Sequence, residues 1–425
     1  MERQEYPNTG ECAYYETLPN GLCLIVVTKP DYKKSMAFFV TNYGGADRRF
    51  QLNGEWHDTP AGVAHFLEHK MFDMEDGQNA LTLLSGRGAD ANAFTSSDMT
   101  AYHFESIADF YANLKLLLKF VSVPYFTEES VRKEQGIIGQ EIKMTEDEPD
   151  YTMYYGLLKE LYQHNPVRES VAGTVESISH ITAKTLYDCH KVFYNPSNMA
   201  LVVVGDQEPE RILEKVEQVL PRTPGPIPVI DHGPDDGMNP NGKRSERVME
   251  VGSTMFLAGV KTASGLRGRE AVKFELTAGL AMSALMGRAS PLYSKMYAEG
   301  LINDTFSYEF ESTADISFAA FGGECIEPDK VFDRVMKEAE NFAKGGFDKS
   351  FFRRRKKSSM GRALRALNSF DSICYNVANA AFRGYDFFDT VSMLEAITEE
   401  EVMNFAGTYL KPEKSAISII YRQEK

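Results

Sequence analysis

The sequence contains little cysteine, and its arrangement could not fix a fold through disulfides. The five cysteines are an odd number, are scattered along 425 residues, and include no CxxC pair. This usage is typical of reduced thiols inside a cell and argues against a disulfide framework. We therefore expect a cytoplasmic protein.

Long apolar runs and strongly basic stretches at the start are also missing. No apolar run reaches the ~18 residues that favour a membrane-spanning helix. The opening residues, "MERQEYPNTGE", have neither the basic and apolar regions of a secretory signal nor the pattern of a mitochondrial presequence. The net charge of -15 argues against nucleic acid or anionic lipid as the main partner. We expect no membrane and no nucleic-acid partner.

The length predicts two domains, because single domains seldom exceed roughly 250 residues. Residues 221–243, "PRTPGPIPVIDHGPDDGMNPNGK", are dense in Pro, Gly, Asp and Asn and cannot hold a regular element. We predict an N-terminal domain over 1–220, a linker over 221–243 and a C-terminal domain over 244–425.

The two halves end in the same pattern, at an offset of 216 residues. "ITAKTLYDCHKVFYNPSNMALVVVG" closes the first half and "ITEEEVMNFAGTYLKPEKSAISIIY" the second. In each, a threonine (Thr182 or Thr398) is placed to cap a helix, a proline turn (Pro196 or Pro412) ends it, and an apolar strand follows. A chance match is the alternative, but the shared order and position favour duplication.

Apolar periodicity indicates strands in pairs and helices in runs. Such a pattern favours an α+β fold, with helices packed on an antiparallel-rich sheet, over a parallel βαβ sheet. We predict two similar domains of this kind, related by a pseudo-twofold. The elements predicted in the first half are strands over 21–29, 35–44, 89–96 and 100–107, and helices over 60–73, 76–85, 107–122, 127–145 and 149–162.

The stretch "GVAHFLEHKMF" places His65, Glu68 and His69 within one predicted helix, although the chain has only eight histidines. Thr59 is the expected cap of this helix. Two imidazoles four residues apart share a helix face and can bind one Zn²⁺, and the adjacent carboxylate can take a proton from metal-bound water. HxxEH is the inverzincin pattern. The alternative is an ordinary helix with its histidines hydrogen-bonded.

A third zinc ligand is needed, and the helix "TEESVRKEQGIIGQEIKMTEDEPD" offers Glu134 and Glu141. They lie seven residues apart on one stripe, close to isoleucines, so partial burial and a partner are expected. Ion pairs with Lys133 and Lys143 on a solvated face are an equally good interpretation of the spacing alone.

Together, "AHFLEHKMF", "EQGIIGQEI" and "ADANAFTSSDMTAYHFES" resemble the M16 metallopeptidase family of pitrilysin, insulin-degrading enzyme and mitochondrial processing peptidase. The similarity covers nearly the whole chain and is strongest to the short, bacterial M16B branch. The resemblance implies a zinc endopeptidase with one Zn²⁺ per chain, held by His65, His69 and Glu141. It further implies that Glu68 is the general base and that the Glu134 carboxylate supports the site.

The family binds an extended peptide along a sheet edge beside the zinc. The resemblance places that edge at "NAFTS", so Asn92, Ala93 and Phe94 are the expected substrate contacts, by strand addition. At the 216-residue offset, His65, Glu68 and His69 map to Ala281, Ala284 and Leu285, and Glu141 maps to Lys357. The second half is therefore not expected to hold a second zinc.

One departure from the family pattern concerns the Arg and Tyr that hold the substrate. Tyr297 and Asp304 occupy those positions, Tyr308 is a possible substitute for the tyrosine, and the segment 292–311 has no arginine. The chain thus resembles the zinc half of a two-chain peptidase, whose partner chain would carry the Arg/Tyr pair. An active homodimer and a non-catalytic scaffold subunit are the alternatives.

The basic segment "FFRRRKKSS", residues 351–359, is unusual in an acidic chain. A solvated helix face is its simplest interpretation. An anchor for acidic substrate segments or for a partner chain is the functional alternative.

Overall fold

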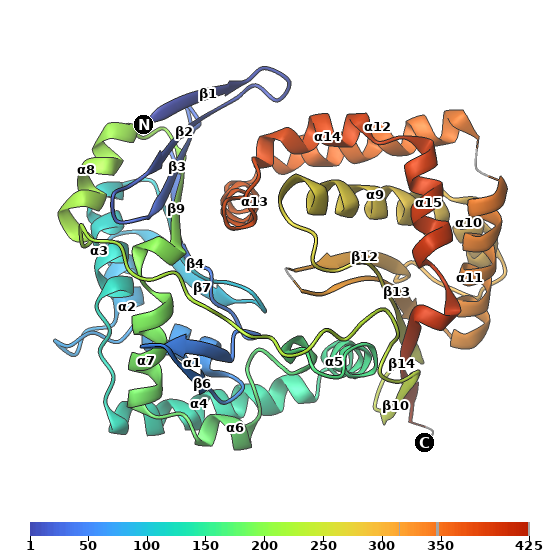
Figure 1. Ribbon diagram of the computed structural model, residues 1–425, viewed down its shortest axis with the longest axis horizontal. Coiled ribbons are helices and arrows are strands. Elements are labelled where there is room, and N and C mark those ends of the chain that lie inside the picture. Colours follow the sequence, from blue (N-terminus) through green and yellow to red (C-terminus); the bar gives the residue numbers. More distant parts are fainter. Residues whose placement is uncertain (314, 346–347, 424–425) are drawn as a thin grey trace. The chain divides into compact units, whose positions relative to one another are not determined.

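The structure is a computed structural model that describes residues 1–313, 315–345 and 348–423. The chain forms two compact units, shown with their elements in Figure 1. The first unit consists of residues 1–143, 170–232 and 364–388. The second unit consists of residues 144–169, 233–363 and 389–425. Each half of the chain therefore lends one segment to the other half's unit.

The first unit is built on a mostly antiparallel sheet in which only the β3–β9 pair is parallel. Across the described sheet, its strands are β1 (Glu2–Tyr6), β2 (Glu11–Thr17), β3 (Cys23–Thr28), β9 (Met199–Gly205), β4 (Ser35–Thr41), β8 (Thr100–Ser106) and β7 (Ala89–Thr95). β5 (Arg49–Leu52) and β6 (Glu55–Asp58) pair separately. The strand β7 thus lies at an open edge.

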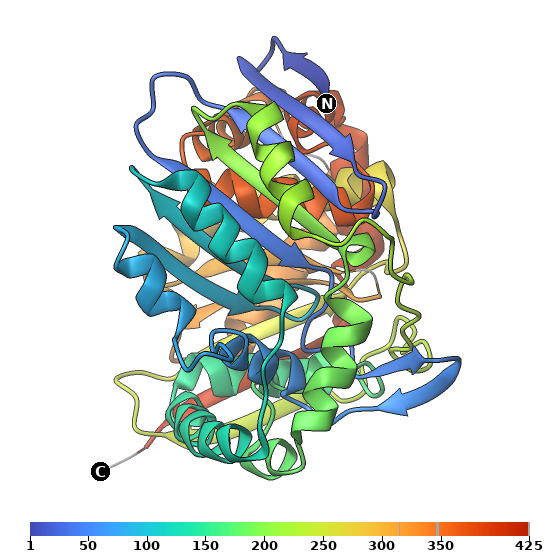
Figure 2. The ribbon, with the colours of Figure 1, turned by 90° about the vertical axis from the view of Figure 1, so that its left-hand side faces the viewer.

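Helices cover both faces of this sheet. Figure 2 shows α3 and α8 lying in front of its strands. Because both faces are covered, the central strands β4 and β9 are buried along their whole length and are apolar except for Ser35 and Thr41 at the ends of β4. The helices of the first unit are α1 (Val63–Lys70), α2 (Ala80–Ser85), α3 (Phe110–Ser122), α4 (Glu128–Glu146, up to Lys143), α6 (Val175–Ser179), α7 (Ala183–Phe193), α8 (Pro209–Val219) and α13 (Phe370–Arg383).

The second unit repeats the arrangement around a smaller sheet. Its described strands are ordered β10 (Arg244–Met249), β14 (Ser415–Arg422), β11 (Met255–Lys261), β13 (Ser317–Glu324) and β12 (Ser307–Ser312). Its helices are α5 (Pro149–Leu161), α9 (Gly268–Met286), α10 (Pro291–Ala298), α11 (Pro328–Gly345), α12 (Lys349–Ala366, up to Ala363), α14 (Thr390–Ala396) and α15 (Glu399–Tyr409).

The two units share one topology, which confirms the predicted pair of similar α+β domains. The order β10-β14-β11-β13-β12 repeats β3-β9-β4-β8-β7, and in each unit only the first of these pairs is parallel. The duplicated ends of the two halves fold as α7–β9 and α15–β14. Thr182 and Thr398 cap these helices through their side chains, as expected from the sequence.

Two helices belong to the unit of the other half, so the predicted ranges 1–220 and 244–425 differ from the compact units. Helix α13 packs on β4 and β9 of the first unit. Helix α5 packs on β10, β11 and β14, and Leu157, Leu158 and Leu161 join Phe318 and Ala320 in an apolar cluster. The local pattern shows that these helices have an apolar face but not which sheet will cover it.

The predicted linker contains no helix and no named strand in the described chain, as expected. Its first part runs along β5, where the Gln51 amide donates to the Val229 carbonyl at 3.0 Å and the Asp231 amide to the Arg49 carbonyl at 2.9 Å. No helix within the described ranges combines the length and apolar character that crossing a membrane requires.

The second unit contains a largely buried carboxylate on its edge strand β12. Burial raises the pKa of Glu311 to about 7, although the Tyr154 hydroxyl donates a 2.7 Å hydrogen bond that works in the opposite direction. The nearby charge of Glu309 raises this pKa further. Folding therefore favours the protonated form of Glu311.

We predict that Glu311→Gln stabilises the protein at alkaline pH. The folded pKa exceeds the ordinary value of 4.5, so the wild-type free energy of unfolding should fall as pH rises from there to about 7. Glutamine keeps an acceptor for Tyr154 and should recover up to about 3 kcal/mol at about pH 8, with little gain at about pH 4. Urea unfolding at both pH values measures this difference. The exposed Glu250→Gln is the control, and an equal effect at both pH values would contradict the prediction.

Candidate metal centre

The helix that carries the histidine pair begins at a glycine that nothing larger could replace. Gly62 precedes α1 with a φ of 95°, in the left-handed region that disfavours side chains. A Cβ at this position would lie 2.5 Å from the Ala172 carbonyl oxygen. The prediction that Thr59 caps this helix is wrong, because its hydroxyl donates instead to the Arg48 carbonyl at 2.9 Å. Backbone approach fixes where α1 starts.

Helix α1 has one apolar side and one side with the proposed chemistry. Phe66 and Leu67 are fully buried in the core of the first unit. His65 and His69, one turn apart, bring their rings to 4.6 Å between centroids, and Glu68 lies between them in sequence. Burial of the apolar side therefore decides the direction in which both imidazoles point.

Helix α4 supplies the two carboxylates expected from the sequence. Ile138 is fully buried and anchors α4, whereas Ile137 is 49% exposed. Glu134 and Glu141, two turns apart, both reach the histidines of α1. In the described structure neither glutamate pairs with Lys133 or Lys143, so the site interpretation of this stripe fits better than the solvated one.

The three predicted ligands have a spacing that fits zinc. His65 Nε2 lies 3.5 Å from Glu141 Oε1, and His69 Nε2 lies 3.6 Å from Glu141 Oε2. Ligands of a tetrahedral zinc at 2.0–2.2 Å stand roughly 3.3–3.6 Å apart. One ligand atom from each residue can be chosen with all three within 4.8 Å of one another. Two imidazoles and one carboxylate also form a donor set of catalytic zinc sites, which keep a fourth position open.

The two imidazoles are held in different ways. His69 Nδ1 lies 3.1 Å from Glu134 Oε1, which suits an N–H donating to the carboxylate while Nε2 faces the proposed metal position. His65 Nδ1 is buried and has no hydrogen-bond partner among the described residues. The Nδ1 atom of His69 is therefore held by Glu134, whereas the Nδ1 atom of His65 has no such support.

The carboxylates also tune the histidines electrostatically. Burial alone would lower the pKa of His69, but the hydrogen bond with Glu134 and the charges of Glu68, Glu134 and Glu141 raise it on balance. The hydrogen bond with His65 lowers the pKa of Glu141, and the charge of His65 adds to this effect. Burial of Glu141 works in the opposite direction and raises its pKa. The metal-free site therefore favours the protonated form of His69, and a metal must displace that proton.

Glu68 is held by a residue that the sequence analysis did not single out. It is 7% exposed, and its Oε2 accepts a 2.6 Å hydrogen bond from the Thr95 hydroxyl. Thr95 is the last residue of β7, and Thr100 lies 3.3 Å from it, hydroxyl to hydroxyl. The motif "NAFTS" includes Thr95, but nothing in its alternation shows that this hydroxyl reaches α1. Glu68 is thus fixed by the same edge strand that carries Asn92, Ala93 and Phe94.

The expected substrate-binding residues lie on the exposed edge of the first unit's sheet. Asn92 is exposed, and its side-chain oxygen accepts from the Ala93 amide at 2.9 Å. Phe94 is half-buried and contacts the ring of Tyr375 at 6.0 Å. These three residues therefore lie on the one strand of this sheet edge that pairs only with β8 in the described sheet.

The Arg/Tyr positions of the second half have different surroundings. Tyr297 is 53% exposed on α10, and Tyr308 is half-buried on β12. The Asp304 carbonyl accepts a 2.8 Å hydrogen bond from Arg288. Arg288 lies just before the segment 292–311, so the structure brings an arginine to this region that a search of the segment alone misses.

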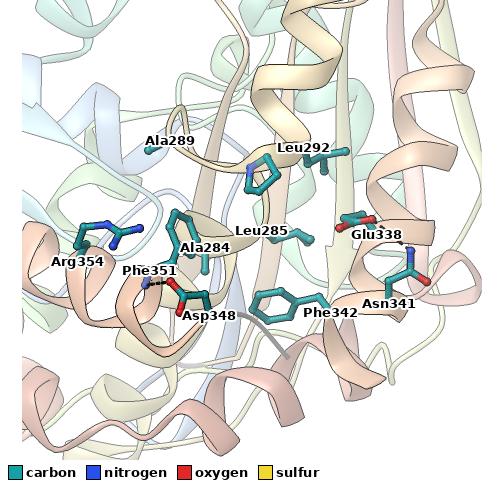
Figure 3. Close-up of a pocket in the computed structure, with 11 residues that line it drawn as sticks. Ala284, Leu285, Ala289, Leu292, Glu338, Asn341, Phe342, Asp348, Phe351 and Arg354 are labelled. Carbon is teal, nitrogen blue, oxygen red and sulfur yellow. Dashed lines mark hydrogen bonds between the residues drawn. The ribbon is translucent and has the colours of Figure 1, made fainter. Parts of the chain in front are cut away.

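The second unit has a cavity of about 540 Å³ that is lined in part by Ala284 and Leu285, to which the 216-residue offset maps Glu68 and His69. Figure 3 shows Ala284 and Leu285 of α9 among the residues that line it, together with Phe351 and Arg354 of α12. The Asp348 carboxylate at its rim accepts from backbone amides at the start of α12. The counterparts of Glu68 and His69 are therefore apolar, and the cavity offers no set of metal ligands among the described residues.

Comparisons with known proteins define the class. The family model described as insulinase (peptidase family M16) matches residues 53–175, and the model described as peptidase M16 inactive domain matches residues 180–359. The zinc protease YmfH of Bacillus subtilis, itself described as uncharacterized, is 40% identical over 94% of each chain. The chain belongs to peptidase family M16, which confirms the resemblance inferred from the motifs.

Two further relatives place it within the family. An M16-like peptidase from Alicyclobacillus acidocaldarius superposes with a TM-score of 0.93 and 31% identity, covering 99% of this chain and 100% of that one. A mitochondrial-processing peptidase subunit beta from Arabidopsis thaliana is 27% identical over 48% of this chain and 38% of its own length.

We predict that His65→Ala abolishes zinc binding by the purified chain. One of the three predicted ligands is lost, and two ligands hold zinc far more weakly. Metal analysis after dialysis should give about one zinc per wild-type chain and none for the variant. Because protons compete with zinc for His69, the wild-type affinity should also fall as the solution is acidified. His164→Ala, at an exposed histidine, is the control. Full zinc occupancy in His65→Ala would exclude the assigned site.

Proposed function

We propose that the chain is a zinc-dependent endopeptidase that binds one zinc through His65, His69 and Glu141. The observation that carries the proposal is the spacing of the Nε2 atoms from the Glu141 carboxylate, 3.5 and 3.6 Å, which suits a tetrahedral ion. The relatives named as zinc proteases support the same chemistry.

Glu68 is the proposed general base. Zinc, when bound, polarises a carbonyl and makes water a better acid. The Glu68 carboxylate accepts the proton of the attacking water and later donates it to the leaving amine. Thr95 holds one carboxylate oxygen in place, which leaves the other free to exchange the proton. Glu134 keeps the His69 ring oriented throughout.

The proposed substrate is an extended peptide or leader segment that pairs with β7. This strand ends at Thr95, whose hydroxyl contacts Glu68, so a peptide along the edge would pass beside the proposed base. Asn92, Ala93 and Phe94 would contact it, and its backbone would compete with the Asn92 side chain for the Ala93 amide.

We predict that Glu68→Gln keeps zinc and loses peptidase activity. The amide cannot accept a proton, whereas His65, His69 and Glu141 are unchanged. We expect at least a ~100-fold fall in kcat on a quenched fluorescent peptide, as for loss of a general base. The exposed Glu75→Gln, also in the first unit, is the matched control.

The result also separates the enzyme from the alternative of a non-catalytic scaffold subunit. Cleavage that is equally fast in Glu68→Gln and the wild type would reject the base assignment. Absence of cleavage from wild type and variant alike, with zinc bound and a partner present, would favour the scaffold.

We further propose that the active form needs a second M16-like chain that carries the Arg/Tyr pair, with a homodimer as the alternative. The support is the replacement of that pair by Tyr297 and Asp304. The relative named as a processing peptidase subunit is one part of an assembly by its name. The five cysteines are all free, which fits a cytoplasmic location for such an assembly.

We predict that the isolated chain cleaves short flexible peptides slowly. Without an arginine clamp the scissile bond is loosely positioned, and positioning can contribute several kcal/mol. Addition of an Arg/Tyr-bearing partner chain should raise the rate by about two orders of magnitude, or roughly 3 kcal/mol. The control is the same partner with its Arg and Tyr replaced by alanine. Efficient turnover by the single chain, unchanged by the partner, would favour the homodimer and direct attention to Arg288.

A further inference from the structure

A lysine is buried at the end of the helix that carries the histidines. Lys70 directly follows His69, and its side chain is 1% exposed, one of the largest fully buried side chains of the described structure. Lysines are almost never fully buried without a partner, because the ammonium group loses its hydration. This position therefore requires a reason beyond the packing of its methylene groups.

The ammonium group of Lys70 has two carboxylates beside it. It donates a short hydrogen bond to Asp73, three residues later. Its Nζ also lies 4.0 Å from Glu134 Oε2. The other oxygen of Glu134, Oε1, lies 3.1 Å from His69 Nδ1. Glu134 thus bridges the buried ammonium group and the imidazole.

We propose that Lys70 is a positioning residue for the metal centre, acting through Glu134 on His69. This inference rests on the proposed function, because it assigns zinc as the ion that His69 binds. Glu134 is only 15% exposed and stands near two other carboxylates, Glu68 and Glu141. The Lys70 ammonium supplies the opposite charge that lets Glu134 remain there, facing His69.

Two electrostatic effects of Lys70 on the ion oppose each other, and the geometry decides between them. A positive charge near the site repels zinc directly, but the Glu134 carboxylate stands between the ammonium group and the His69 ring. Without Lys70, Glu134 would be a largely buried carboxylate without its ammonium partner, and it would turn towards water. That change weakens the bond that holds His69, whose partner ring His65 has no such support at Nδ1 in the described chain. The net effect of Lys70 is therefore to strengthen metal binding.

The test is the zinc affinity of Lys70→Met, measured by chelator competition on the metal-free protein. Loss of a group that supports a metal-binding histidine typically costs about tenfold to a hundredfold in affinity. We expect that loss in Lys70→Met and a similar one in Glu134→Gln. The double variant should be no weaker than Glu134→Gln alone, because Lys70 acts only through Glu134. The double variant also removes the Glu134 carboxylate, which Lys70→Met alone would leave without its ammonium partner. It therefore still tests the inference if Lys70→Met alone does not fold.

Asp73→Asn is the matched control, since it removes the other partner of Lys70 but leaves the Glu134 contact in place. It should keep the wild-type zinc affinity. The visible spectrum of the cobalt(II)-substituted protein gives a second readout: Lys70→Met should shift the bands as Glu134→Gln does, and Asp73→Asn should not.

Zinc affinity in Lys70→Met equal to or above that of the wild type would overturn the inference, as would additive losses in the double variant. Lys70 would then be only a buried ion pair of the fold. A wild-type protein that binds no zinc would instead reject the proposed function itself, so the two failures are distinguishable.

Discussion

The site depends on how helix α1 is seated against the first unit's sheet. The left-handed Gly62 passes so close to the Ala172 carbonyl that a single added carbon would not fit, and Phe66 and Leu67 fill the core below. With its start and its apolar side both fixed, an eight-residue helix has little freedom to rotate. The positions of His65 and His69 on the helix are therefore fixed by packing, and Glu134 orients the His69 ring, before any metal arrives, which lowers the ordering cost of binding.

The second constraint is charge. Three carboxylates, Glu68, Glu134 and Glu141, surround two imidazoles in a partly buried space, an arrangement that is unfavourable without cations. The raised pKa of His69 is one response of the metal-free chain, and the Lys70 ammonium is another. A divalent ion would neutralise the negative charge of the carboxylates that remains. The same carboxylates would therefore attract the metal and repel one another when it is absent.

The parts of this molecule that could be predicted from sequence are those encoded by short spacings. HxxEH places three groups on one turn of a helix, and the duplicated Ile-Thr ends gave both caps and both closing strands. Thr59 failed as a cap because the backbone, not a side chain, sets the start of α1. Thr95 and Lys70 were missed because their roles depend on contacts across the fold, with Glu68 and with Glu134. The exchange of α5 and α13 between units was missed for the same reason, because the apolar face of a helix does not show which sheet it packs on.

The two duplicated units differ in one respect: among the described residues, only the first has the cluster of imidazoles and carboxylates. The units share a sheet order, and α9 and α12 lie in the chain where α1 and α4 do. At the mapped positions Ala281, Ala284 and Leu285 are buried in the second unit's core, where the first unit has polar groups that each need a partner. Apolar residues there avoid that requirement and favour stability, since an unsupported cluster of carboxylates and imidazoles is costly to bury. On the proposed function, cleavage would need only the first unit's site, so the second unit could vary around Tyr297 and Asp304, in accord with the proposed clamp from a partner chain.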